Sequence, residues 1–289
     1  MLARVAQMTT TLPLGPPVLG LALGADAAVE DGWLVRDLTI PDGLDGPPGI
    51  LQGGFAAGLL ASIARTADGF GAPLTTLEAR LHAPMPLARQ VRARLRTADG
   101  VARTEVEVRD HDRVLVSGTV ELAGHEPPPL GLDLLELATV PLPDAVPQDE
   151  YPTCVVCGAH PRHPVGFRLH PRYGPGGTIV QPWVPTDELG TDGVVDPLVV
   201  AAVLDCPTVW ASIRPMREAG YLGALLAGFR IVHHRGVRVD EPVRIVARCD
   251  GMDGRKVRAR SAVLDEEGTV YAVASAFHVA VTALPDPPG

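Results

Sequence analysis

The sequence of 289 residues has little lysine and little cysteine. Lys256 is the single lysine, and 34 acidic residues outnumber 25 basic ones, which gives a net charge of -9. Nucleic acids and anionic membrane surfaces attract basic faces, so we expect neither a nucleic acid nor a membrane as partner. No uninterrupted apolar run is long enough to cross a membrane. Four scattered cysteines exclude a disulfide scaffold and favour a reducing cytoplasmic location.

The chain is rich enough in apolar residues to bury a substantial core. Hydrophobic residues make up 46% of it and charged residues 20%. The length fits one large domain or two of ordinary size, and we expect two.

The N-terminal segment, residues 1–30, is expected to be a loose arm. Its basic start and apolar stretch loosely resemble a secretion signal, which is the alternative. Gly15-Pro16-Pro17 interrupts that stretch and favours the arm.

Two long apolar segments predict buried helices. The first follows Gln52-Gly53-Gly54. The second is centred on 197–210, and Asp196 before Pro197 predicts an N-cap with proline at the first helical position. Alternating strand formers follow each helix, which predicts a run of antiparallel strands in both halves.

The repeated order predicts a duplicated unit. Proline-rich residues 125–150 cannot join a sheet ladder and predict a linker. The expected division is an arm at 1–30, a first unit at 31–124, the linker, a second unit at 151–283 and a tail at 284–289. Two such units side by side would share a sheet and remove an exposed edge.

Three local features carry a resemblance to a known family. They are Gln52-Gly53-Gly54, the segment Ala202-Val203-Leu204-Asp205, and Cys154-Val155-Val156-Cys157-Gly158 leading to Gly166-Phe167-Arg168-Leu169. With the duplicated order, the chain resembles the hotdog-fold acyl-CoA thioesterases in a two-unit, single-chain form. The resemblance implies an α+β tandem hotdog, each unit a long buried helix wrapped by a curved antiparallel sheet.

The resemblance also implies a site between the units. In such enzymes a helix carboxylate activates water, and backbone N–H groups at a glycine-marked helix start hold the thioester oxygen. Asp205 and the pair Gly53 and Gly54 match these roles, with Thr208 as a group that orients water or the carboxylate and Gln52 as a further amide donor. Enzymes of this kind also use a Ser or Thr and a Gln on later strands, where this sequence offers Leu226 and Ala276. No cofactor is expected.

Each of these residues has a structural alternative. A buried carboxylate such as Asp205 is often satisfied by neighbouring hydroxyls or an arginine. Gly53 and Gly54 would equally suit close packing of a helix on a sheet, and Gln52 a helix cap.

Arginine is the better partner for phosphate oxygens, so an acidic chain that binds CoA would gather arginines locally. The candidates are Arg65, Arg80, Arg89, Arg230 and Arg235.

A separate cluster, Cys154, Cys157, His160 and His163, places four zinc-capable side chains on one loop. The histidines are closer in sequence than in the usual zinc motifs and prolines stiffen the loop, so a thiol-rich packed turn is the expectation and a metal the alternative.

The sequence therefore favours a thioester hydrolase that acts on an acyl-CoA, as a monomer or homodimer of double-unit chains. A non-catalytic acyl-CoA or lipid-binding protein is the alternative, and a hydratase or dehydratase is the second alternative. The latter needs a histidine beside the acid, and none lies near Asp205 in sequence.

Overall fold

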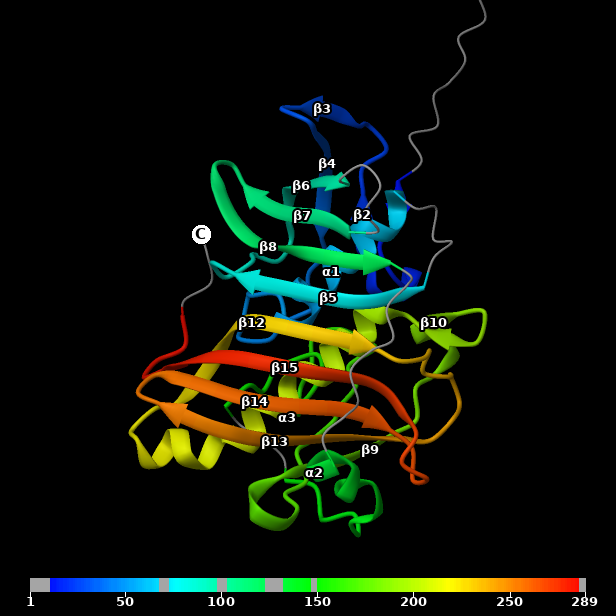
Figure 1. Cartoon of the computed structure of the whole chain (residues 1–289). Helices are drawn as coiled ribbons and strands as arrows, with labels where there is room; N and C mark the ends of the chain where they lie inside the picture. Colours follow the sequence, from blue (N-terminus) through cyan, green and yellow to red (C-terminus); the bar gives the residue numbers. More distant parts are fainter. Residues whose placement is uncertain (1–10, 68–72, 98–102, 123–131, 147–149, 286–289) are drawn as a thin grey trace, which may run out of the picture.

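A computed structural model of the chain describes residues 11–67, 73–97, 103–122, 132–146 and 150–285. Two long helices, α1 (Gly53–Ala67) and α3 (Pro197–Glu218), lie on one side of a large antiparallel sheet. In Figure 1 the sheet is in front and both helices are behind it. The predicted order of one helix followed by strands, repeated twice, is therefore present.

The first unit surrounds α1. Its strands are β4 (Trp33–Ile40), β5 (Leu74–Leu81), β6 (Arg89–Thr97), β7 (Arg103–Asp110) and β8 (Arg113–Leu122). Val106, Val108 and Val120 alternate with exposed or half-buried residues, so one face of the strands packs on α1.

The second unit surrounds α3. Its strands are β9 (Ile179–Trp183), β12 (Gly223–His233), β13 (Val243–Asp253), β14 (Lys256–Leu264) and β15 (Val270–Val281). A small hairpin of β10 (Gly190–Thr191) and β11 (Val194–Val195) precedes the helix. Asp196 caps α3 as predicted, because its carboxylate accepts a hydrogen bond of 2.8 Å from the Leu198 N–H, and Pro197 is the first helical residue.

The two units share one sheet. Strand β5 pairs antiparallel with β12, with Phe229 opposite Ala79 and Arg230 opposite Glu78. The first-unit strands, blue to green, run directly into the yellow-to-red strands of the second unit (Figure 1). The helices also pack against each other. Both contacts bring the start of α1 close to the middle of α3.

Residues 11–30 are not a loose arm, which corrects the prediction for the described part of that segment. Strands β1 (Leu12–Pro13), β2 (Ala22–Leu23) and β3 (Ala28–Glu30) extend the sheet beyond β4, with a short turn of 3-10 helix at Pro17–Leu19. Leu14, Leu19 and Leu23 are fully buried. The apolar stretch therefore covers the edge of the sheet, and residues 1–10 lie outside the described residues.

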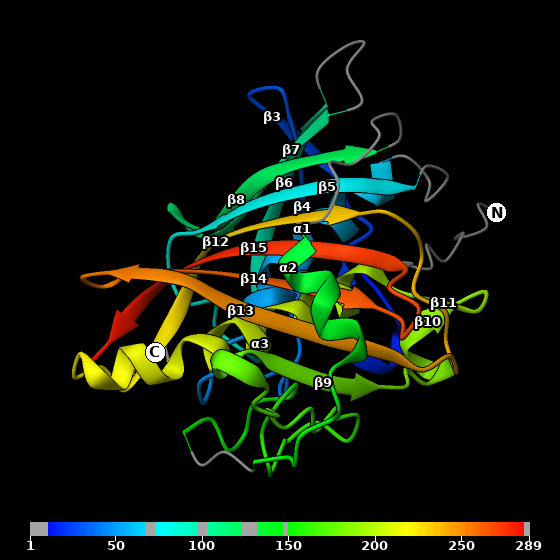
Figure 2. The same cartoon turned by 60° about the horizontal axis from the view of Figure 1, so that its bottom comes forward.

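Part of the proline-rich linker is also structured. Short helices α2 (Leu132–Leu135) and η2 (Glu136–Thr139) lie against the outer face of β13 and β14, as Figure 2 shows. Leu134 and Leu137 are buried there with Val246 and Ala262. Residues 123–131, 147–149 and 286–289, which include the rest of the predicted linker and most of the tail, lie outside the described residues.

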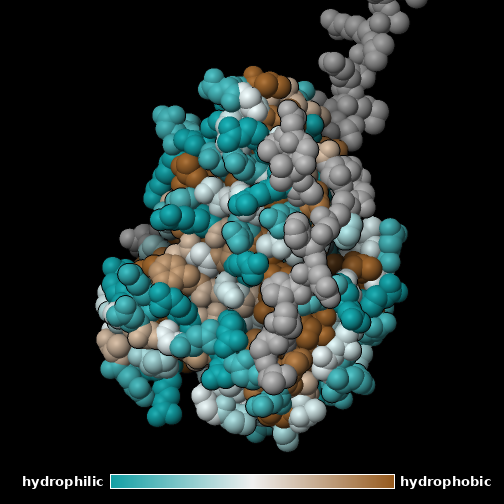
Figure 3. Space-filling model, viewed as in Figure 1, coloured by the Kyte–Doolittle hydropathy of each residue, from teal (hydrophilic) through white to brown (hydrophobic). Residues whose placement is uncertain are grey.

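Elsewhere the outer face of the sheet is mostly polar. Figure 3 shows hydrophilic side chains spread over this face with smaller apolar areas between them. Among the described helices, α3 alone is long and apolar enough to cross a membrane, but most of it is buried inside the protein.

Candidate functional site between the two units

Asp205 lies on α3 at the wall of a cavity of about 240 Å³ between the units. The first unit contributes the start of α1 and the end of β5 to the cavity, and the second contributes α3, β12 and the loop at 151–157. Most of the lining is apolar, including Ile50, Leu81 and Leu226. A mostly apolar cavity with few polar groups is typical of a small-molecule site.

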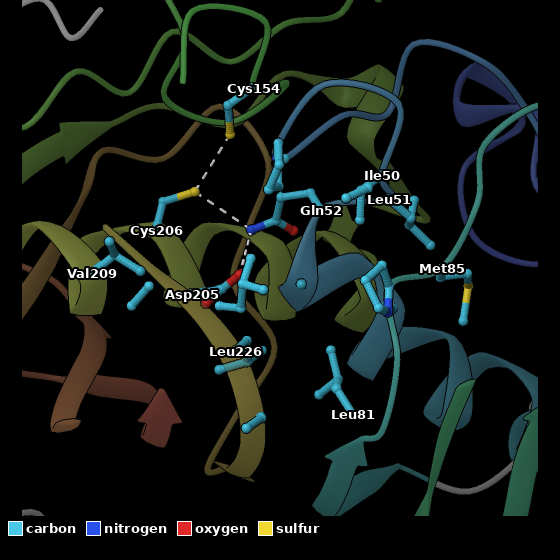
Figure 4. Close-up of a pocket in the computed structure, with 18 of the residues that line it drawn as sticks. Ile50, Leu51, Gln52, Leu81, Met85, Cys154, Asp205, Cys206, Val209 and Leu226 are labelled. Atoms are coloured by element: carbon cyan, nitrogen blue, oxygen red, sulfur yellow. Dashed lines mark hydrogen bonds between the residues drawn. The ribbon is translucent and has the colours of Figure 1, made fainter. Parts of the chain in front are cut away.

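The Asp205 carboxylate is held by the start of α1. Its Oδ2 accepts hydrogen bonds from the Gly54 N–H at 2.9 Å and from the Gln52 side-chain amide at 2.8 Å. Figure 4 shows the Gln52 amide between Asp205 and Cys206. Asp205 Oδ1 is buried and has no hydrogen-bond partner among the described residues. One oxygen is thus anchored, and the other is a buried acceptor without a partner among these residues.

The pKa of Asp205 is raised to about 7, chiefly by burial; the Gly54 N–H opposes the shift, and the neighbouring Cys154 adds to it. The carboxylate at this position therefore holds a proton more readily than an exposed one.

Gln52 is a helix cap and a carboxylate ligand at once. It is buried, and its Oε1 accepts a hydrogen bond of 2.9 Å from the Phe55 N–H in the first turn of α1. The amide orientation that this bond requires directs Nε2 at Asp205. The cap predicted as the alternative is present, and the amide donor points at the acid.

The two glycines have different surroundings. A Cβ on Gly54 would lie 2.3 Å from the Ala201 carbonyl oxygen and 2.7 Å from Ala202 Cα, so Gly54 allows α1 and α3 to approach closely. Its N–H is also taken by Asp205. Gly53 lines the cavity, and Gly54 does not. Of the pair, Gly53 is the one placed to face a ligand.

Thr208 does not reach the Asp205 carboxylate. Its hydroxyl donates to the backbone carbonyl of Asp205 at 2.6 Å, a bond that threonine makes readily to the preceding helical turn. It also lies 2.7 Å from Nε2 of His278 on β15. Thr208 therefore contacts the helix backbone and His278 and not the Asp205 carboxylate. This arrangement does not support its predicted role in orienting water or the carboxylate.

His278 was missed by the sequence analysis. The register pairs it with Leu226, so His278, and not Ala276, is opposite Leu226 on the last strand. It is fully buried, and burial lowers its pKa to about 4. The alternation of β15, which buries residues 272, 274, 276 and 278, was the signal for an inward histidine.

The predicted cysteine and histidine cluster is rearranged. Cys154 and Cys157 are buried beside Cys206, and the three Sγ atoms lie within 4.8 Å of one another. His160 is exposed, and His163 Nδ1 accepts from the Val165 N–H. The third thiol, Cys206, follows Asp205 in sequence. It reaches Cys154 and Cys157 only because α3 packs against their loop.

The thiols perturb one another. The Cys157 and Cys206 thiols, together with the backbone N–H groups of Cys157 and Val156, hold the pKa of Cys154 well below its usual value. The Cys154 side chain is also the first cause of raised pKa values of Cys157 and Cys206.

The predicted phosphate-binding arginines lie away from the cavity wall. Arg80, Arg230 and Arg235 are exposed, and Arg230 pairs with Glu78 across the junction of the units at 3.0 Å. Arg65 is 3.9 Å from Asp196, and Arg89 is 3.5 Å from Asp110. Their role in holding a nucleotide stays a prediction.

One cavity residue was also missed. His82 follows β5 and lines the same cavity as Asp205, with its Nε2 2.8 Å from the Ser117 hydroxyl. It is distant from Asp205 in sequence, so only the pairing of the two units reveals it.

No protein-family model matches the chain, and there is no match among curated proteins. Solved structures do match over most of its length. A putative thioesterase from Novosphingobium aromaticivorans is 17% identical with a TM-score of 0.58, covering 87% of this chain and 96% of its own. The acyl-CoA thioesterase II TesB2 from Mycobacterium marinum is 14% identical with a TM-score of 0.53, covering 88% and 95%.

The dehydratase domain of a mycocerosic acid synthase-like polyketide synthase is equally similar. It is 16% identical with a TM-score of 0.55, covering 89% of this chain and 94% of its own. The chain therefore has the double-hotdog fold, as predicted, and this fold is shared by thioesterases and dehydratases.

Proposed function

We propose that the protein hydrolyses a thioester of the acyl-CoA type in the cavity between its two units. The observation that carries the proposal is the Asp205 carboxylate in that cavity, with Oδ2 anchored by Gly54 and Gln52 and Oδ1 left without a partner among the described residues. A fixed carboxylate with one unused oxygen suits a general base for water. The double-hotdog acyl-CoA thioesterase of similar fold supports CoA as the carrier.

In the proposed reaction the Asp205 carboxylate takes a proton from a water molecule while the water oxygen forms a bond to the thioester carbonyl carbon. The carbonyl electron pair moves to oxygen. Gly53, in the first turn of α1, faces the cavity, where its own N–H and the positive end of the helix favour that negative charge, since the N–H groups of Gly54 and Phe55 are already bonded. The oxyanion then collapses, the carbon–sulfur bond breaks, and the thiolate recovers the proton from Asp205. The products are a carboxylic acid and a free thiol.

Asp205→Asn tests the role of the acid. The amide oxygen can accept the bonds from Gly54 and Gln52, but the amide cannot take a proton. We expect turnover of acyl-CoA esters, measured as free thiol release, to fall about 100- to 10,000-fold. The melting temperature should stay within a few degrees of the original.

Asp196→Asn is the matched control, because it makes the same change on the same helix away from the cavity, and asparagine is an equally good N-cap. It should leave turnover unchanged. Turnover at the original rate in Asp205→Asn would reduce Asp205 to a structural carboxylate. Saturable acyl-CoA binding by the original protein without any hydrolysis would establish the non-catalytic alternative.

A hydratase or dehydratase is the second candidate, because His82 supplies the histidine that such chemistry needs on the cavity that Asp205 lines. This second function predicts reversible addition of water to an enoyl thioester, and His82→Gln should abolish that activity. Thioester hydrolysis without hydration of the enoyl substrate would exclude it.

A further inference from the structure

Three cysteines converge on one wall of the cavity. Cys154 and Cys157 come from the loop before β9, and Cys206 comes from α3. Each is nearly inaccessible to solvent, and Cys154 Sγ lies 3.7 Å from Cys206 Sγ (Figure 4). Thiolates on tetrahedral zinc, at about 2.3 Å from the metal, are about 3.8 Å apart. The 3.7 Å separation is therefore compatible with a metal ion shared by the two sulfurs, and all three Sγ atoms lie within 4.8 Å of one another.

The loop that carries two of the thiols is held in place by backbone hydrogen bonds. The Gly158 N–H donates to the Cys154 carbonyl at 2.8 Å, which closes the Cys-x-x-Cys turn. A Cβ on Gly158 would lie 2.5 Å from the Pro152 carbonyl oxygen and 2.6 Å from that of Cys154. Val155 and Val156 accept from Phe167 and Leu169, which extends the anchoring to the next segment. The turn is therefore fixed without any bond between the sulfurs.

The surroundings provide hydrogen-bond donors for negative sulfur. The Gln52 amide nitrogen lies 3.4 Å from Cys206 Sγ, and the N–H groups of Val156 and Cys157 interact with Cys154. Such donors offset part of the single negative charge that three thiolates around a dication would carry.

A second observation points to a ligand at the same place. Asp205 Oδ1 is fully buried without a hydrogen-bond partner among the described residues, and Asp205 lines the cavity together with all three cysteines. A group of sulfurs that merely filled core space would face apolar neighbours, whereas this one lines a cavity together with an unsatisfied carboxylate and lies 3.4 Å from a buried amide. Soft sulfur ligands favour thiophilic ions over magnesium or calcium.

We propose that Cys154, Cys157 and Cys206 bind one thiophilic divalent cation, Zn²⁺, whose fourth coordination position faces the cavity. A water or an atom of a bound molecule completes the tetrahedron, because the Asp205 carboxylate is not among the groups whose ligand atoms lie within 4.8 Å of all three sulfurs. His160 and His163 of the predicted cluster are not ligands in this site. The proposal rests on the three thiols and not on thioester hydrolysis, so either can fail without the other.

The test uses the whole chain, purified under reducing conditions and supplied with one metal at a time. Elemental analysis and native mass spectrometry should find one zinc per chain. Cobalt(II) in its place should give the thiolate charge-transfer band and the intense visible bands of a tetrahedral site. Cys206→Ser and Cys157→Ser should each weaken cobalt binding by more than about 100-fold, beyond what loss of an outer partner costs.

Cys249→Ser is the matched control, because Cys249 is on β13, away from the cluster, and its loss should leave both stoichiometry and spectrum unchanged. Circular dichroism on each variant establishes that it is folded. If a serine variant does not fold, the cobalt spectrum of the original chain decides.

Three results would overturn the proposal. They are less than a tenth of a zinc per chain after metal supply, a cobalt spectrum without thiolate charge transfer, and metal binding of equal strength in folded Cys206→Ser. A mass lower by two hydrogens after purification without reductant, together with no metal uptake by the reduced chain, would instead indicate a disulfide, which peptide mapping would assign to two of the cysteines.

Discussion

At the scale of residues, the site depends on the pairing of Asp205 with Gln52, which are 153 positions apart. Each of the two side chains has the other as a buried hydrogen-bond partner only because the fold brings them together. Gln52 is oriented by the cap that it forms on α1, and the buried carboxylate would lack a partner for Oδ2 without the amide and the Gly54 N–H. Buried polar groups persist when such partners exist and cost about 1–3 kcal/mol when one is removed.

His278 makes the free energy of unfolding dependent on pH. Its folded pKa of about 4 lies below the ordinary value of 6.5. Below pH 6.5 the unfolded chain gains a proton that the buried ring does not, so stability is lost as the pH falls from about 6.5 towards 4, by up to about 3 kcal/mol. Below the folded pKa both states are protonated and this loss ends.

His278→Gln should make that dependence less steep, because an amide stays neutral; His233, whose pKa burial also lowers to about 4, accounts for a similar part of it. Urea titrations at a series of pH values between 4.5 and 7 would measure the slope. His111→Gln, on an exposed turn between β7 and β8, is the matched control for the loss of one histidine. An unchanged slope in His278→Gln would show that His278 does not couple folding to protons.

At the scale of elements, the central feature is the contact between α1 and α3. The helices meet through Gly54 and Gly58 on one side and Ala201 on the other, with no room for a Cβ at Gly54 and little room for one at Gly58. The close approach is what allows the first turn of α1 to donate to a carboxylate in the middle of α3.

Gly54→Ala should separate the helices, because its Cβ would meet backbone atoms that cannot move alone. We expect a loss of about 1–3 kcal/mol in the free energy of unfolding, measured by denaturant titration. Gly228→Ala on β12 is the matched control, because its Cβ would make only ordinary contacts, the nearest at 3.6 Å to Phe277. Equal stability of the two variants would mean that the α1–α3 contact is more compliant than the structure indicates.

At the scale of the whole molecule, the two units complete each other. The pairing of β5 with β12 leaves neither strand as an edge, and each unit supplies part of one cavity. A single unit of this kind would expose both a strand edge and the apolar flank of its helix.

Residues 1–124 and 131–289, expressed separately, should therefore not give two soluble monomers. Expressed together, they should associate through β5 and β12 and elute as one complex in size-exclusion chromatography. For the intact chain we expect at most a further dimer, because the internal pairing already satisfies the edge. Two monodisperse monomers with native circular dichroism would contradict the shared-sheet argument.

The features of this protein that the sequence predicted all depend on local chemistry. The start of α3 at Asp196-Pro197, the strand alternation and the repeated order of helix and strands were all predictable, because caps, proline geometry and hydrophobic periodicity act over a few residues. The repeated order, together with the resemblance to the hotdog-fold thioesterases, predicted the double-hotdog fold. The same signals placed Asp205 on a buried helix.

The tertiary structure decided everything that needs two distant segments to meet. The sequence predicted a loose arm that includes Leu14, Leu19 and Leu23. These side chains are buried because their segment packs at the edge of the sheet. Cys206 replaces the histidines beside the cysteine pair because α3, and not the rest of the loop, packs against it. Thr208 turns away from the carboxylate because its hydroxyl bonds the preceding turn and His278, partners that sequence spacing alone does not select.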